Sequence, residues 1–318
     1  MKKLFVLISL SFILFGCSKK KVYEKENDTI YFGSYPQTLV TDNNIKEELN
    51  KKITNLPNKD NLCGWTDCNY YISFKVESYM YYIDIDLDNN GTNDYRGIYF
   101  NQYRPNGTIF ESTESTSFQS KNGYFINNVY WFKYEKIKWD ILENDKKEAT
   151  LISNLVIDSQ EYYHIIYKEK VEHNGGYGYT NSYELSNIRK WLNDNFYNLA
   201  FNSKEKEIII NKLIDNSAKS TDTIDNIYYS DDTNDYVTLL SYQEVLKYYE
   251  SKSRNTLGTD YAKCQGLTTY EDTVSWHLRS ASSDCTGSSW YVENGESIVY
   301  YNIYDSSSGV RPVITIKL

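Results

Sequence analysis

The sequence predicts an α+β fold in which mixed or antiparallel sheets pack against two or three helices. Segments with alternating apolar residues, typical of half-buried strands, occur in residues 81–87 and 310–318. Residues 185–199 instead carry apolar side chains at helical spacing. The hydrophobic content of 40% and the aromatic content of 16% supply enough apolar surface for a packed core.

The N-terminus has the pattern of an export signal. Met1-Lys2-Lys3 is basic, and Leu4 to Phe15 is an apolar run of twelve residues. Such a run is too short to span a hydrocarbon core of about 30 Å, so we expect a signal peptide over residues 1–16 instead of a membrane helix. The polar, lysine-rich residues that follow favour a tether over residues 17–28.

The end of the apolar run, Leu14-Phe15-Gly16-Cys17, resembles the lipobox of bacterial lipoproteins. The resemblance implies that Cys17 becomes the first residue and carries acyl chains such as palmitate. Two or more acyl chains anchor a protein stably. We therefore expect a lipid-anchored, extracytoplasmic protein at the cell membrane or outer surface. A plain secretory signal with an incidental cysteine is the alternative.

The remaining chain predicts one α+β domain over residues 29–318, with a β-rich part (29–142) followed by a second part (143–318). Residues 29–37 predict its first strand, and Asp42 is a good N-cap for a helix that ends near Pro57. Asn90-Gly91 between two apolar segments predicts a hairpin of residues 81–87 and 95–100.

Helices are expected mainly in the second part. After strands at 123–142 and 149–157, the stripe at 185–199 predicts one helix, and Ser203 is expected to cap another that carries Ile208 to Ile210. Ser241 to Glu244 is a capping box that opens a third helix. In the last segment, alternate residues (Val310, Pro312, Ile314, Ile316 and Leu318) face the core of a half-buried strand.

The predicted hairpin contains a metal-ligand pattern. Asp86, Asp88, Asn90 and Asp94 match the first, third, fifth and ninth positions of a calcium loop. The twelfth position is Gly97 instead of a bidentate Glu, and no helices are expected beside the loop. The alternating acidic residues also fit the solvent face of a strand. We therefore expect no cofactor, with calcium at these four residues as the alternative.

Export changes the expectation for the cysteines, because disulfides form outside the cytoplasm. Four cysteines follow Cys17, and they allow three pairings. We favour Cys63–Cys68 as a short local loop and Cys264–Cys285 across the C-terminal part. Zinc binding and free buried thiols are the alternatives.

An ordered set of short motifs resembles a widespread bacterial domain of unknown function over Ile30 to Leu318. The motifs lie at residues 31–37, 95–100, 188–193, 200–205, 239–244, 259–262, 276–280 and 309–312. Their order is further similar to the C-type-lectin-like fold of the formylglycine-generating enzymes. Within these motifs we expect Arg279 and Arg311 to be structural, each bonded to buried carbonyls or to a carboxylate such as Glu205 or Glu244.

Composition and motifs restrict the function without identifying a ligand. The net charge of -9 argues against nucleic-acid binding. The three histidines and the serines match no hydrolase motif, so no catalytic residue is predicted. We expect a non-catalytic, lectin-like binding or adhesion module, attached to the membrane by its lipid anchor, that meets a glycan or protein ligand at loops 175–179, 216–235 and 282–289. The alternatives are an enzyme related to formylglycine-generating oxidases, with redox-active Cys264 and Cys285, and an inert structural lipoprotein of the envelope.

Overall fold

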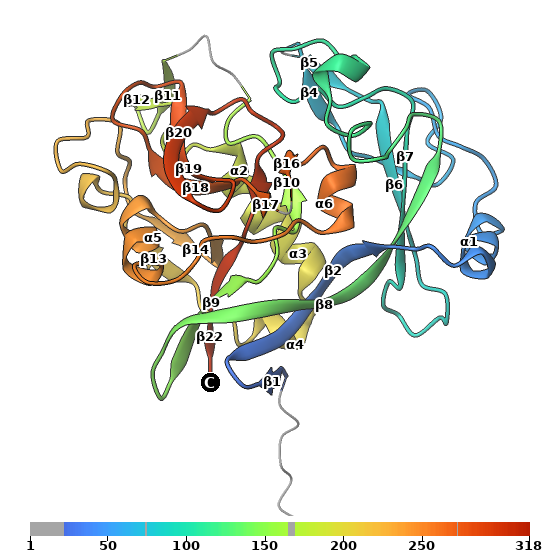
Figure 1. The fold of residues 1–318 in the computed structure, drawn as a ribbon, viewed down its shortest axis with the longest axis horizontal. Helices are drawn as coiled ribbons and strands as arrows, with labels where there is room; N and C mark the ends of the chain where they lie inside the picture. Colours follow the sequence, from blue (N-terminus) through green and yellow to red (C-terminus); the bar gives the residue numbers. More distant parts are fainter. Residues whose placement is uncertain (1–21, 74, 165–168, 272) are drawn as a thin grey trace, which may run out of the picture.

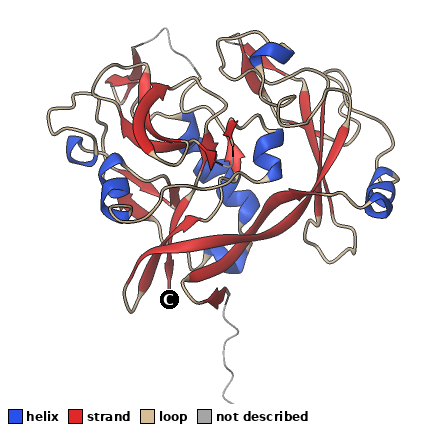
Figure 2. Ribbon diagram, viewed as in Figure 1, coloured by secondary structure: helices blue, strands red, loops and turns tan. Residues whose placement is uncertain are grey.

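Strands dominate the computed structural model, which describes residues 22–73, 75–164, 169–271 and 273–318 (Figures 1 and 2). Strands make up 38% of the structure and helices 15%. The predicted α+β, C-type-lectin-like fold is therefore wrong, and the protein has a sheet-rich fold with a few short helices. Cys17 and the predicted signal peptide lie outside the described residues.

The largest sheet has nine strands and connects the N-terminal and C-terminal parts of the chain. Along its main path the strands are β15 (Val237–Thr238), β22 (Val313–Lys317), β9 (Glu148–Ser153), β8 (Val129–Asn144), β7 (Tyr95–Phe100), β6 (Met80–Ile85) and β3 (Thr66–Asp67), and off it lie β1 (Glu24–Glu26) and β2 (Thr29–Leu39).

The long strand β8 holds this sheet together. Its first residues pair with β7, its last residues pair with β9, and β2 pairs with the stretch Phe132 to Asp140. In Figure 1, β8 and β2 run along one side of the molecule, with β6 and β7 at one end and β9 and β22 at the other. Strand β1 pairs with β2 inside the segment that the sequence predicts to be a tether.

A second sheet of five strands belongs to the C-terminal part. Its order is β10 (Asp158–Ser159), β21 (Gly309–Val310), β18 (Trp276–Ala281), β19 (Ser288–Glu293) and β20 (Ser297–Asn302). Four two-stranded sheets complete the strands: β4 (Tyr70–Ile72) with β5 (Lys75–Glu77), β11 (Lys170–His173) with β12 (Gly176–Tyr179), β13 (Lys212–Ile214) with β14 (Thr233–Asp235), and β16 (Thr269–Tyr270) with β17 (Thr273–Val274).

The helices are short. They are α1 (Asn43–Asn50), the continuous α2 (Asn187–Lys190), η2 (Trp191–Phe196) and α3 (Tyr197–Ala200), then α4 (Ser203–Lys206), α5 (Tyr242–Tyr248) and α6 (Asp260–Cys264), with single turns η1 (Glu114–Thr116) and η3 (Ala218–Ser220). Asp42 caps α1, and the capping box of Ser241 and Glu244 opens α5, as predicted. No helix in the described ranges is long and apolar enough to cross a bilayer.

The helix predicted after Ser203 shows why helix content is low. Asn202, not Ser203, caps α4, which ends at Lys206. The three β-branched residues that follow favour extended backbone. Ile209 bridges to Ile316, and the Ile210 N–H donates to the Thr315 carbonyl at 2.8 Å. Pairing with the last strand therefore replaces the second half of the predicted helix.

The last strand, β22, lies inside its sheet between β9 and β15. Ile314 and Ile316 contribute to the main apolar cluster, and Val313 packs into a second one. Thr315 is buried as well, whereas Leu318 is exposed. The predicted strand is present, but its central position buries both of its faces.

Candidate functional site

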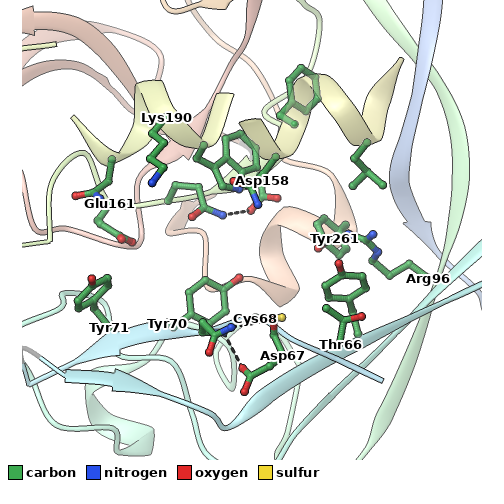
Figure 3. A pocket seen from close by; sticks show the side chains of 18 of the residues that line it. Thr66, Asp67, Cys68, Tyr70, Tyr71, Arg96, Asp158, Glu161, Lys190 and Tyr261 are labelled. Atoms are coloured by element: carbon green, nitrogen blue, oxygen red, sulfur yellow. Dashed lines mark hydrogen bonds between the residues drawn. The ribbon is translucent and has the colours of Figure 1, made fainter. Parts of the chain in front are cut away.

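A cleft of about 540 Å³ lies between the N-terminal and C-terminal parts of the chain. In Figure 3, Thr66, Asp67, Tyr70 and Tyr71 lie on one side, and Asp158, Glu161 and Lys190 face them from the other. The volume falls within the range of roughly 300–1,000 Å³ that is usual for small-molecule sites. The two parts of the chain thus form one concave site together.

Asp158 is the most buried acid of the cleft. Its carboxylate accepts hydrogen bonds from the Tyr35 hydroxyl at 2.6 Å, the Ser159 N–H at 2.7 Å and the Gln160 amide at 3.1 Å. Burial raises the pKa of Asp158, and the three hydrogen bonds act in the opposite direction. Because both carboxylate oxygens are occupied, Asp158 holds Tyr35 and Gln160 in place.

Tyr35 reaches Asp158 because β2 is bulged. Gly33 has a φ of +67°, and the register of β2 against β8 shifts between Tyr31 and Ser34. A Cβ at Gly33 would lie 2.6 Å from a ring atom of Phe201, so only glycine fits here. The Gly33 N–H donates to the Glu205 carboxylate at 3.1 Å, which fixes the bulge.

Arg96 is the buried cation of the cleft. Its guanidinium donates to both oxygens of Asp84, at 2.7 and 2.6 Å. It also lies over the Tyr82 ring, 4.1 Å from the centroid, and its Nη1 donates to the Tyr261 hydroxyl at 3.4 Å. The bidentate pair with Asp84 neutralises the Arg96 charge.

One wall of the cleft is a helix with a π-helical turn. Segment η2 interrupts the helix between α2 and α3, and such turns often occur at functional sites. This wall contributes Lys190, Trp191 and Asn195. The Trp191 ring stacks on Phe196 with centroids 5.8 Å apart, which fixes its orientation.

Strand β4 forms the facing wall. The Tyr71 ring stacks on His164 of the C-terminal part, with centroids 3.9 Å apart. The Tyr70 ring lies under Arg104 at 4.0 Å, and its hydroxyl donates to the Gln265 side chain. Arg104 also pairs with Glu161 at 3.2 Å. These contacts hold both rings in the cleft and join the two parts of the chain.

A second depression, of about 390 Å³, lies elsewhere on the protein beside Phe110, Tyr270 and Tyr301. Its buried acid Asp305 and the residues beside it bond to one another. Asp305 accepts hydrogen bonds from Ser307 and Ser308, and the Ser307 hydroxyl accepts one from Thr268 at 2.8 Å. This depression is aromatic like the cleft, and its buried acid Asp305 is already engaged within the protein.

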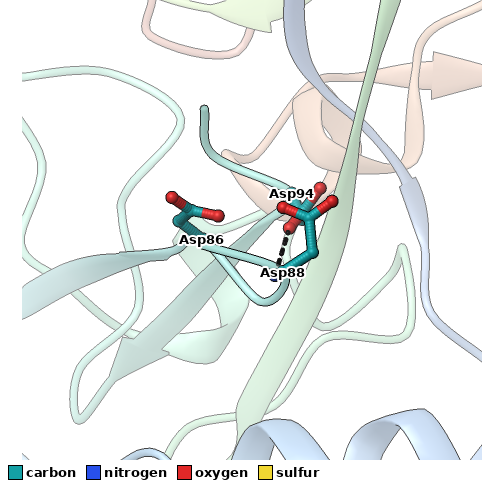
Figure 4. A group of neighbouring side chains, drawn as sticks. All are labelled: Asp86, Asp88 and Asp94. Carbon is teal, nitrogen blue, oxygen red and sulfur yellow. Dashed lines mark hydrogen bonds between the residues drawn. The ribbon is translucent and has the colours of Figure 1, made fainter. Parts of the chain in front are cut away.

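The predicted calcium residues do gather in one loop (Figure 4). Oxygens of Asp86, Asp88 and Asp94 lie within 4.8 Å of one another. These carboxylates also accept backbone N–H groups of their own loop, such as Gly91 to Asp86 at 2.8 Å. The Asn90 side-chain oxygen already accepts the Thr92 N–H at 2.8 Å. The loop is thus stabilised internally, and calcium binding stays a prediction.

The predicted disulfides Cys63–Cys68 and Cys264–Cys285 are wrong, because all four described cysteines are free. Cys63 lies in a turn with a φ of +50°, whereas Cys68 lines the cleft. Cys264 is buried in α6 and Cys285 is exposed. Burial raises the pKa of the Cys68 thiol to about 12 and that of Cys264 well above its usual value. Neither buried thiol is therefore a ready nucleophile.

The two C-terminal arginines are buried among protein partners. Arg279 pairs with Glu244 and donates to the Leu239 carbonyl at 2.7 Å. Arg311 donates to the Ser153 carbonyl at 2.8 Å and to the Tyr249 hydroxyl at 2.9 Å. Neither arginine lines the cleft, and Glu205 bonds to β2 instead of to an arginine.

The cleft is not built from the loops at 175–179, 216–235 and 282–289 in which the sequence predicts ligand binding. It takes side chains from four of the motifs quoted for the family resemblance: Tyr35, Arg96, Trp191 and Tyr261. These motifs were therefore the sequence signal that could have indicated the cleft residues. The missing information was spatial, because nothing in the sequence brings together residues more than two hundred positions apart.

These features define a sheet-rich protein with an aromatic, polar cleft between two parts of one chain. Residues 147–318 match the family described as "Domain of unknown function (DUF6273)", and the chain belongs to this family. No curated protein and no solved structure matches the chain. The match begins beside β9, so it includes one side of the cleft.

Proposed function

We propose that this protein is a lipid-anchored, extracytoplasmic binding or adhesion module and that the cleft holds its ligand. The observation that carries the binding role is the cleft itself, a concave site with fixed aromatic rings and polar side chains from both parts of the chain. No nucleic-acid partner fits the negative charge of the protein.

The anchor is proposed from the N-terminal residues. Leu14-Phe15-Gly16-Cys17 follows a basic start and an apolar run, and acylation of Cys17 would attach the protein to the membrane. In Figure 1, β1 and β4 lie at opposite ends of the view. A tether that leads into β1 would therefore leave the β4 side of the cleft facing away from the membrane.

The binding role is proposed as non-catalytic because the acids of the cleft are already engaged. Asp158 accepts three hydrogen bonds, and Glu161 pairs with Arg104. The oxidase alternative places redox-active thiols at Cys264 and Cys285. Burial raises the pKa of Cys264, and Cys285 is exposed and does not line the cleft.

A lipidation experiment tests the anchor. Full-length protein and a Cys17→Ser variant are expressed in a bacterial host with an alkyne-labelled fatty acid. We expect label and membrane recovery only for the wild-type protein. An unlabelled wild-type protein in the cytosol would overturn the proposed anchor.

Ligand binding tests the cleft. Thermal-shift screening of the full-length protein against saccharides, peptides and inorganic ions should find a ligand whose stabilisation disappears in Trp191→Ala. Stabilisation that survives in this variant would place the ligand outside the cleft and would contradict the proposed site.

A further inference from the structure

We infer that the cleft binds a neutral saccharide; this inference rests on the proposed binding function and names its ligand class. Three independent properties of the cleft support it: fixed aromatic rings, charges that cancel within the protein, and polar side chains without a protein partner. A sugar presents apolar C–H faces and many hydroxyl groups, so it can pack on the aromatic rings and form hydrogen bonds with the free polar side chains at the same time.

The aromatic rings of the cleft are held on one face and still line the cavity. Trp191 rests on Phe196, Tyr71 rests on His164, and Tyr82 is covered by the Arg96 guanidinium. A ring that is already held in position loses little conformational freedom when a ligand packs on it. These rings therefore offer preorganised apolar surfaces to a flat, ring-shaped ligand.

The charges of the cleft cancel before any ligand arrives. Arg96 is paired bidentately with Asp84, and Glu161 is paired with Arg104. Asp158 is surrounded by neutral donors, and burial raises its pKa. Asp67 and Lys190 also line the cleft and make no ion pair among the described residues, but their charges are of opposite sign. Because the cleft thus offers one unpaired charge of each sign and no cluster of like charges, this arrangement favours a neutral ligand.

Several polar side chains of the cleft have no hydrogen-bond partner in the described part of the chain. They are the Thr66 hydroxyl, the Tyr82 hydroxyl, the Trp191 indole N–H and the Asn195 amide. Three of these groups both donate and accept, as sugar hydroxyls do, and the indole only donates. A polyhydroxylated ligand can satisfy all of them.

Other ligand classes fit less well. A phosphate ligand is bound best by several free cations, but of the described residues that line the cleft Arg96 is already paired, which leaves Lys190 alone. An extended peptide would add to a free sheet edge, and β3 at the edge beside the cleft has only two residues. A purely apolar ligand would leave the free polar groups buried without partners.

Isothermal titration of the full-length protein in detergent tests the inference. The probes are neutral oligomers of glucose, galactose, mannose and N-acetylglucosamine, with oligogalacturonate, inorganic phosphate, and an acidic and a basic peptide for comparison. We expect at least one neutral oligosaccharide to bind, and oligogalacturonate, phosphate and both peptides to give no heat.

Two cleft variants and one matched control localise the binding. Trp191→Ala removes a ring, and Asn195→Ala removes an exposed amide, which leaves the fold intact. Each should weaken saccharide binding about tenfold, since loss of a good ring or hydrogen-bond contact has an effect of that order. Tyr177→Ala removes a ring that is 72% exposed on β12, outside the cleft, and should change nothing.

The outcomes separate the two proposals. Binding of a charged probe that both cleft variants weaken, with no binding of neutral saccharides, would overturn the saccharide inference and keep the binding function. No cleft-dependent binding of any probe would overturn both. The inference would also be overturned if Tyr177→Ala weakened saccharide binding and the two cleft variants did not.

Discussion

The cleft and the surroundings of Arg279 and Arg311 both contain buried arginines, and they differ in where their unpaired polar groups lie. Arg279 and Arg311 direct their donors to carbonyls, a carboxylate and a hydroxyl of the protein. In the cleft Arg96 and Glu161 are paired too, but Thr66, Trp191 and Asn195 keep polar groups without a partner among the described residues. Strand β18 also has polar atoms without a partner, Arg279 Nε and Trp276 Nε1 among them, but these atoms are buried, whereas the unpaired groups of the cleft line an open cavity.

The largest expected effect comes from Arg279 in β18. Arg279→Met should lower the free energy of unfolding by about 3 kcal/mol, because it leaves Glu244 and a buried carbonyl without their partner. Urea unfolding measures the change. Arg254→Met, which removes an exposed bond to the Glu296 carbonyl, is the control and should cost less than about 1 kcal/mol. Equal losses in both variants would contradict a structural role for Arg279.

The next largest effect is the contribution of His277 to the pH dependence of the free energy of unfolding. Burial lowers the pKa of its imidazole to about 4 in the folded protein, from an ordinary value of roughly 6.5. Between these values the unfolded chain binds more protons, so the stability from His277 is complete above pH 6.5 and is lost as pH falls. From pH 7 to pH 4 the loss should be about 3 kcal/mol.

The pH prediction is measured as a difference between two proteins. His277→Gln keeps a polar side chain but cannot titrate, so subtracting its pH profile removes the contributions of the buried carboxyls Asp158 and Asp305. An identical pH dependence in wild type and variant would show that His277 is accessible to protons in the folded state.

The cleft should give a small effect on stability. Thr66 and Asn195 are exposed, and their side chains have no hydrogen-bond partner among the described residues. Thr66→Ala and Asn195→Ala should therefore each change the free energy of unfolding by less than about 0.5 kcal/mol. Urea unfolding tests this. A loss above about 2 kcal/mol in either variant would show that the residue stabilises the fold, as Arg279 is expected to do, and would contradict the difference between the two regions.

Calcium should have the smallest effect. The loop at Asp86, Asp88 and Asp94 lacks the bidentate glutamate of a tight site, so we expect a dissociation constant of about 1 mM. Calcium at 1 mM should then stabilise the protein by about 0.4 kcal/mol, and Asp86→Asn should remove this gain. If calcium stabilised Asp86→Asn as much as the wild-type protein, the loop would be excluded as the calcium site.

The sequence predicted the elements that local rules govern. The Asp42 cap and the Ser241 capping box occur as expected, because each depends on neighbouring residues. The hairpin at Asn90-Gly91 also occurs, but its first strand ends at Ile85 instead of Leu87, so residues 86–94 form a longer loop. The last strand was also predicted from its alternating apolar residues. Its burial on both faces was not, since this depends on which strands lie beside it.

Long-range contacts account for the errors. Ile208 to Ile210 continue a helical stripe in the sequence, but Ile209 bridges to Ile316 near the end of the chain. The predicted cysteine pairs depend only on spacing along the sequence, whereas in the structure Cys264 lies in the core and Cys285 on the surface. The cleft joins Tyr35, Arg96 and Tyr261, which only the folded chain brings together.

Hydrogen exchange of the full-length protein, with and without a neutral oligosaccharide found by titration, tests the central claim most directly. We predict slower exchange on ligand binding in residues 66–71 and 187–195, which line the two walls of the cleft. Protection confined to the second depression, in residues 106–118 and 291–304, would contradict the assignment of the cleft as the binding site.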